Sequence, residues 1–179
     1  MLHNPERATM KNTHIAAALL VSGLVSSLAA TAAGAQEIVR HKIPGSDFPI
    51  AQAVTLPASA TIHFISGQVP PVVDKAANPD SLAAYGDTKT QTVGVLKKID
   101  EILKSMNLAM GDVVKMQVFL VGDPAKGGRA DVKGFMEGYT QFFGAAAAQP
   151  NLPARAVMQV AGLNSPGWLV EIEVTAAKK

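Results

Sequence analysis

Residues 88–121 read TKTQTVGVLKKIDEILKSMNLAMGDVVKMQVFLV, and this stretch decides the fold. In its first half apolar residues recur at three- and four-residue spacing, which predicts an amphipathic helix over residues 88–106 with Asn107 as a left-handed stop. After Gly111-Asp112, the β-rich run 113–121 predicts a strand. The passage therefore predicts one helix followed by one strand.

Toward the C-terminus the pattern adds another helix and two strands. Asp131 can cap a second helix that runs through Phe143 and carries its aromatic residues on one side. Strands are predicted over residues 154–163 and 168–175, joined by the turn Asn164-Ser165-Pro166-Gly167. Because this turn is short, we expect these two strands to pair as a hairpin.

Toward the N-terminus, residues 36–50 predict an arm that leads into strands 51–56 and 61–66. The turn at residues 57–60 favours a second hairpin. The resulting order β-β-α-β-α-β-β predicts an α/β (α+β) domain in which two helices cover one face of a single sheet. On the other face we expect Glu171, Glu173 and Gln159 among apolar side chains. A semi-polar sheet face of this kind favours an oligomer.

The first 35 residues have the layout of a secretory signal peptide. Arg7 and Lys11 precede an apolar run from Ile15 to Ala30, and an A-x-A site follows at residues 33–35. We expect cleavage after Ala35, a single domain over residues 36–179, and a periplasmic or secreted mature chain. Met10 is a second candidate start. A membrane anchor is disfavoured because the run is rich in Ala and Ser.

Composition excludes several classes of site. The chain has no cysteine, so disulfides, thiolate metal sites and a cysteine nucleophile are excluded. Its formal net charge is +2, which gives no electrostatic basis for nucleic-acid binding. His41 and His63, the only histidines after residue 35, have no spaced ligand partner, so we expect no metal site.

Arg155 is the residue type best suited to hold an organic acid. It follows Leu152-Pro153-Ala154 at the start of a predicted strand, and Glu171 lies on the next one. A guanidinium can bind a carboxylate through two parallel hydrogen bonds, and a nearby carboxylate can accept a proton from water. The alternative is a structural salt bridge between Arg155 and Glu171, which the pattern alone leaves open.

Four segments in order resemble the RidA (YjgF) family over about residues 46–176. They are SGQVP at residues 66–70, LKSMNLAMGDVVKMQVF at 103–119, YTQFF at 139–143, and PAR at 153–155 followed by VEIE at 170–173. The resemblance implies a chorismate-mutase-like fold, a homotrimer with a central barrel, and ligand clefts between subunits. It implies no cofactor. From the near-neutral charge and the predicted leader, we expect neither nucleic acid nor, after cleavage of the leader, a membrane as a partner.

The activity that this resemblance implies is hydrolysis of reactive 2-imino and 2-enamino acids to 2-oxo acids and ammonia. By position, Arg155 would hold the substrate carboxylate and Glu171 would place the attacking water. Ser66, Gly67 and Gln68 would line the pocket, and Phe119 would form an apolar wall.

The chain departs from the family pattern at three positions. Ile50 stands where the family's deaminases commonly have Tyr, Met136 where Asn is frequent, and Val157 where Cys is frequent. These changes make the expected pocket more apolar. They keep open an alternative function, a non-catalytic carboxylate-binding or chaperone-like stress protein.

Overall fold

The computed structural model describes residues 37–179, so the predicted signal peptide lies outside the described part of the chain. The strands are β1 Val39–Lys42, β2 Ala51–Thr55, β3 Thr61–Gln68, β4 Val113–Val121, β5 Ala154–Val160 and β6 Val170–Lys178; the α-helices are α1 Thr88–Ser105 and α2 Val132–Tyr139. The helices and strands expected from the sequence are all present, but α2 ends at Tyr139 and not at the predicted Phe143. Strand β1 is an addition within the predicted arm. No helix within residues 37–179 has the length and apolar character needed to span a membrane.

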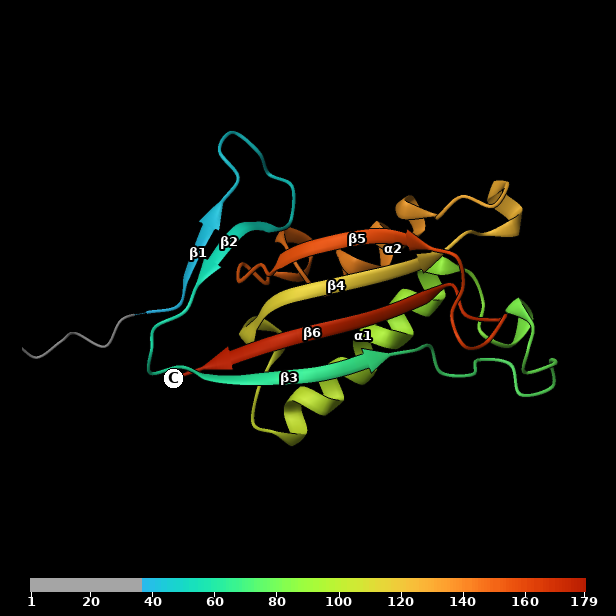
Figure 1. Ribbon diagram of the computed structural model, residues 1–179, viewed down its shortest axis with the longest axis horizontal. Helices are drawn as coiled ribbons and strands as arrows, with labels where there is room; N and C mark the ends of the chain where they lie inside the picture. Colours follow the sequence, from blue (N-terminus) through green and yellow to red (C-terminus); the bar gives the residue numbers. More distant parts are fainter. Residues whose placement is uncertain (1–36) are drawn as a thin grey trace, which may run out of the picture. The chain divides into compact units, whose positions relative to one another are not determined.

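The strands form a single mixed sheet in the order β1-β2-β5-β4-β6-β3 (Figure 1). Strand β4 pairs in parallel with β5 and antiparallel with β6, and β6 pairs antiparallel with β3. Strand β2 meets β5 at one residue pair only, Ala51 with Ala154, and then leaves it together with β1. The edge of β5 is therefore unpaired beyond Ala154 on the side away from β4.

Both predicted hairpins are wrong. Strands β2 and β3 lie in distant positions of the sheet, and β4 separates β5 from β6. The strands of each predicted hairpin are close in sequence, but which strands pair depends on contacts between residues that are far apart in sequence. Strand β4 has alternate side chains with near-zero exposure, so it takes the central position with a partner on each side.

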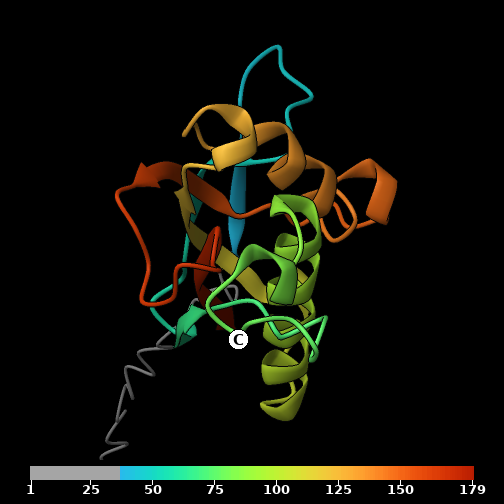
Figure 2. The ribbon, with the colours of Figure 1, turned by 90° about the vertical axis from the view of Figure 1, so that its right-hand side faces the viewer.

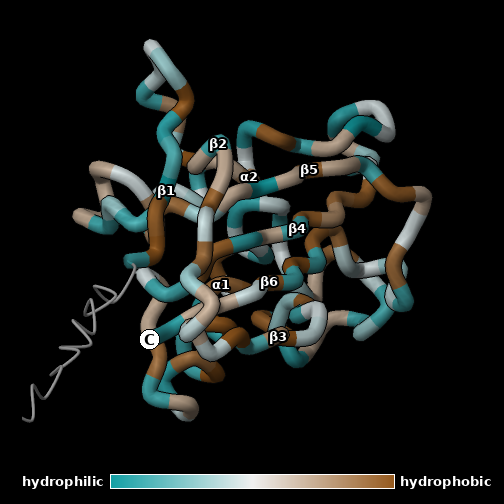
Figure 3. Tube along the Cα trace, turned by 60° about the vertical axis from the view of Figure 1, so that its left-hand side comes forward, coloured by the Kyte–Doolittle hydropathy of each residue, from teal (hydrophilic) through white to brown (hydrophobic). Residues whose placement is uncertain are grey.

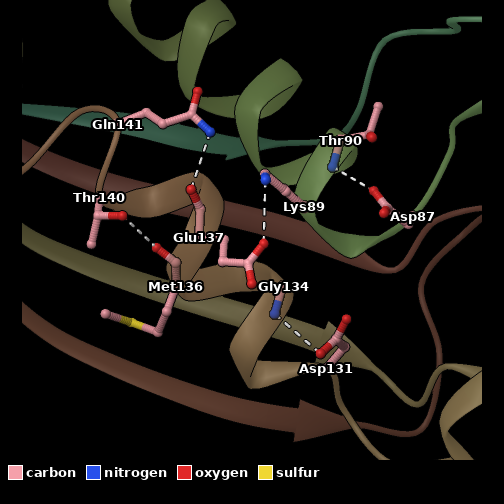
Figure 4. Close-up of polar contacts among 9 residues, drawn as sticks. All are labelled: Asp87, Lys89, Thr90, Asp131, Gly134, Met136, Glu137, Thr140 and Gln141. Atoms are coloured by element: carbon pink, nitrogen blue, oxygen red, sulfur yellow. Dashed lines mark hydrogen bonds and ion pairs between the residues drawn. The ribbon is translucent and has the colours of Figure 1, made fainter.

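Helices α1 and α2 lie on the same face of the sheet, as predicted (Figures 1 and 2). Asp87 caps α1 by accepting from the Thr90 amide, Asp131 caps α2 by accepting from the Gly134 amide, and a Lys89–Glu137 ion pair of 3.2 Å joins the two helices (Figure 4). The core between helices and sheet includes Leu96, Ile99, Leu103, Met116, Val118, Leu120, Phe135, Tyr139, Ile172 and Val174.

The opposite face of the sheet carries polar and apolar groups together. Glu171 and Glu173 lie on it because they pair with Phe119 and Gln117, which alternate with the buried positions of β4. Phe64 of β3 is 83% exposed, and Figure 3 shows hydrophobic and hydrophilic positions mixed along the strands. The placement of Gln159 on this face was wrong. It pairs with the buried Leu120 and binds the 128–130 loop on the helix side.

Gln91 fastens α1 to the segment that leads into β6. This residue is fully buried, and its side-chain amide donates to the carbonyls of Gly86 and Gly167, both at 3.0 Å. Its side-chain oxygen accepts from the Leu169 amide at 2.7 Å. The Gln91 side chain thus makes three hydrogen bonds, and through them it positions the start of β6 and the nearby Glu171.

We predict that Gln91→Leu lowers the free energy of unfolding by about 2–4 kcal/mol, because it leaves one amide and two carbonyls buried without partners. Urea denaturation of the mature chain measures this. Gln141→Leu is the matched control, since the exposed Gln141 makes a single bond to the Glu137 carbonyl. Equal stability of the two variants would contradict the role assigned to Gln91.

Candidate functional site

Arg155 enters an aromatic cage under α2. Its partner on β4 is Met116, whose side chain is buried beneath the helices, so Arg155 points to the helix side of the sheet. The guanidinium carbon lies 4.2 Å from the ring centre of Tyr139, 5.1 Å from that of Phe135 and 5.5 Å from that of Phe48. These ring faces attract the cation without neutralising it.

The guanidinium lacks a carboxylate partner among residues 37–179. Its Nε and Nη1 atoms are buried without a hydrogen-bond acceptor, and Nη2 contacts the thioether sulfur of Met136 at 3.3 Å. The Tyr139 hydroxyl also interacts with the guanidinium. A sulfur atom is a weak acceptor. The described protein thus leaves most of the donors of this arginine unused, and an anion with two oxygens would satisfy them.

Electrostatics around the cage follow from burial. Desolvation lowers the pKa of Arg155, and the nearby Tyr139 opposes this shift. Burial raises the pKa of the Tyr139 hydroxyl to about 12, partly offset by the Arg155 charge. Tyr139 therefore stays neutral near pH 7 and donates its hydroxyl proton to the Pro49 carbonyl at 2.8 Å. That bond connects the segment between β1 and β2, residues 43–50, to the aromatic cage.

A second arginine, Arg40, holds the loop that leads into β5, the strand that carries Arg155. Its guanidinium donates to the carbonyls of Val113, Leu152 and Gly111 at 2.9, 2.7 and 2.8 Å. These bonds join β1 to the start of β4 and to the loop preceding β5. Burial lowers the pKa of Arg40, and Asp112 opposes the shift. Both arginines are thus partly buried, but Arg40 makes three hydrogen bonds to carbonyls, whereas two nitrogen atoms of Arg155 make none within residues 37–179.

Glu171 lies in a separate group on the uncovered face. Its partner on β4 is Phe119, so the two side chains lie side by side there. The pairing of β3 with β6 is irregular between Ile65 and Gln68, at Ser66-Gly67. A Cβ on Gly67 would lie 2.1 Å from the Glu171 Oε1 atom, so a larger residue there would displace that carboxylate from its present position. The predicted residues Ser66, Gly67, Gln68, Phe119 and Glu171 are therefore brought together.

The structure does not bring Arg155 and Glu171 together within one chain. They lie on opposite faces, and β4 separates their strands by about 10 Å. The alternative of a salt bridge between them is wrong for residues 37–179, since neither residue takes part in the ion pairs found there. We call Arg155 with its neighbours the arginine half of the predicted site, and Ser66, Gly67, Gln68, Phe119 and Glu171 the glutamate half. The arginine half lies toward the β5 edge of the strands β5-β4-β6-β3, and the glutamate half lies toward the β3 edge.

The three positions of departure all lie on the arginine half. Met136 touches Arg155, Val157 follows it on the same face of β5, and Ile50 lines a cavity that Arg155 also lines. The sequence did not single out Phe48, Arg40 or Lys115. An aromatic residue in a polar arm was the only available signal for Phe48. Within residues 37–179 no cluster of three His, Asp or Glu side chains is arranged to hold a metal ion.

Comparisons with known proteins identify relatives of this chain. TdcF of Escherichia coli, which carries the name of a candidate reactive intermediate deaminase, is 30% identical over 141 residues, covering 79% of this chain and 95% of its own. A RutC family protein of Pyrococcus abyssi is 30% identical over 148 residues, covering 81% and 99%.

Solved structures show the same fold. Escherichia coli TdcF, determined with bound serine, superposes with a TM-score of 0.51 at 27% identity and covers 80% of this chain and 99% of its own. A Rid family protein of Yersinia pestis gives 0.58 at 22% identity, covering 79% and 98%. The family model described as Endoribonuclease L-PSP matches residues 45–178. With this match over most of its length and the paired segments around Arg155 and Glu171, the chain belongs to the RidA/YjgF family.

Proposed function

We propose that the protein hydrolyses small 2-imino and 2-enamino acids to 2-oxo acids and ammonia, with Arg155 holding the substrate carboxylate. The observation that carries this proposal is the guanidinium of Arg155, which is half-buried among three rings and has two nitrogen atoms without an acceptor in residues 37–179. A structural arginine is normally satisfied, as Arg40 is. The name of TdcF and its structure with bound serine, itself a small carboxylate, support the same chemistry.

The reaction requires water and no change in oxidation state. With the carboxylate on Arg155, water adds to C2 of the imine while Glu171 accepts a proton from it. The nitrogen of the resulting carbinolamine is protonated and leaves as ammonia, and the C2 hydroxyl becomes the carbonyl of the 2-oxo acid. An enamino acid first takes up a proton at C3 to give the imine.

We place the complete site between copies of the chain in a homotrimer. Arg155 lies at the edge where β5 is unpaired, whereas Ser66-Gly67-Gln68 and Glu171 lie at the β3 edge. A cyclic head-to-tail assembly sets the β5 edge of one copy against the β3 edge of the next. The exposed Phe64 and Ile62, at 83% and 46%, lie on the face that such an assembly would cover.

We further propose that this chemistry takes place in the periplasm or outside the cell. The basis is the pattern of residues 7–35, in which two basic residues, an apolar run and an A-x-A site follow one another.

A second candidate function is carboxylate binding without catalysis, as in a chaperone-like stress protein. Met136 and Val157 on the arginine half favour it, because neither can supply the hydrogen bonds of the Asn and Cys that they replace. Calorimetric binding of small 2-oxo acids together with no ammonia release from imines would establish this function instead.

We predict that Arg155→Met leaves the free energy of unfolding unchanged or raises it by up to about 2 kcal/mol, while binding of 2-oxobutanoate is lost. The substitution removes unsatisfied polar atoms but also the attraction of the rings for the cation. Arg40→Met is the matched control and should destabilise by about 2–4 kcal/mol, because three carbonyls lose their donor. Urea denaturation measures the free energy of unfolding of both variants. If Arg155→Met lowered it as much as Arg40→Met does, Arg155 would have a structural role instead.

We predict that inactive Arg155→Ala and Glu171→Gln chains regain about a quarter of wild-type activity when mixed in one trimer. In a random head-to-tail mixture, one interface in four joins an intact Arg155 to an intact Glu171. Ammonia release from an imine generated in situ measures this. The double variant mixed with either single variant should stay inactive. A site contained in one chain would show no recovery, and an active Glu171→Gln homotrimer would remove the role of Glu171.

We predict that Phe64→Asp yields monomers, because an exposed aromatic residue at a subunit interface would become a buried charge. Light scattering measures the molar mass in solution. Val132→Asp is the control, since Val132 is 50% exposed on α2, on the opposite side of the sheet. Retention of the trimer by Phe64→Asp would place the interface elsewhere.

A further inference from the structure

A cavity of about 490 Å³ opens where β2 leaves β5, and Arg155 is among its lining residues. This volume lies in the range of small-molecule sites. Five of its lining residues are aliphatic: Ile43, Ile50, Ala51, Ala154 and Ala156. The cavity thus adjoins the residue that the proposed function assigns to a carboxylate, yet most of its surface suits a hydrocarbon group.

The charges at this cavity all have one sign. Lys115 and Arg155 are its ionisable residues, and no Asp or Glu of the described part of the chain lines it. A negatively charged ligand is therefore attracted to this cavity. Gln52 is the remaining polar residue of the lining. The chemistry fits a molecule with an anionic end and an aliphatic end.

Hydrogen bonds hold the aliphatic wall in place. The Ile50 amide donates to the Phe48 carbonyl at 2.7 Å, and the Ala51 amide donates to the Pro153 carbonyl at 3.0 Å. Between them, the Pro49 carbonyl accepts from Tyr139, the ring closest to Arg155. Ile50 is therefore fixed relative to Arg155 from both sides, which is what a residue that selects ligands requires.

We propose that this cavity receives the aliphatic substituent of the ligand that Arg155 holds, and that Ile50 with Ile43 selects for it. Ile43 and Ile50 also line an adjoining cavity of about 130 Å³, so they form the partition between the two spaces. The inference rests on the proposed function and narrows it. The preferred substrates are 2-imino acids with larger aliphatic side chains, rather than those with a hydroxyl or a second carboxylate.

The test is calorimetric binding of 2-oxo acids, the products of the proposed reaction, to the mature oligomer. The probes are 2-oxobutanoate, 2-oxohexanoate, 4-methyl-2-oxopentanoate and 2-oxoglutarate. We expect affinity to rise about fourfold for each methylene buried. In Ile50→Thr, which removes the terminal methyl group and puts a hydroxyl in place of a methylene, the preference for 2-oxohexanoate over 2-oxobutanoate should fall at least threefold. Val132→Thr is the matched control, because Val132 lies outside the cavity and should leave the preference unchanged.

The outcomes separate this inference from the proposed function. Binding that is lost in Arg155→Ala but independent of chain length would overturn the inference alone, as would tightest binding of 2-oxoglutarate through Lys115. A change of oligomeric state in Ile50→Thr with unchanged ligand preference would show that a second copy fills the cavity, which also overturns it. Absence of any binding that depends on Arg155 would overturn both.

Discussion

The arrangement of this protein depends on a cation that is partly removed from water without receiving an anion from residues 37–179. Burial of the Arg155 guanidinium carries a desolvation penalty, expressed in its lowered pKa. The rings of Phe48, Phe135 and Tyr139 offset part of that penalty through their quadrupoles. The rest of the penalty is not offset within residues 37–179, because Nε and Nη1 lack acceptors there. A carboxylate that supplied these acceptors would therefore bind favourably.

Much of the fold around Arg155 could be predicted because its signals are local. The apolar spacing of residues 88–106 and the run 113–121 identify α1 and β4, and Asp131 caps α2 as expected. The pairings could not be predicted in the same way. Which strands lie beside β4 is decided by contacts between residues far apart in sequence, so proximity along the chain suggested two hairpins that do not exist.

The sequence predicted candidate site residues but not how the sheet separates them. Segment matches pointed to Arg155, Glu171 and Ser66-Gly67-Gln68 as candidates, and in the structure the Glu171 carboxylate lies in the space beside Gly67. The interposed β4 strand was not foreseen, and it places Arg155 and Glu171 on opposite faces. Once that separation is known, a salt bridge within the chain no longer explains Arg155, and a partner outside the chain becomes the simpler account.

The departures at Ile50 and Met136 then have a single physical explanation. Both lie beside Arg155, one in the wall of the cavity and one against Nη2, and both replace hydrogen-bonding side chains by apolar ones. Such changes leave the hydrogen-bond donors of Arg155 in place, because these donors belong to Arg155 itself. In the function proposed above, a ligand held by Arg155 would contact apolar side chains at these positions, which favour a methylene group over a hydroxyl. Loss of polar residues near Arg155 therefore does not argue against the proposed site; it predicts a different range of ligands.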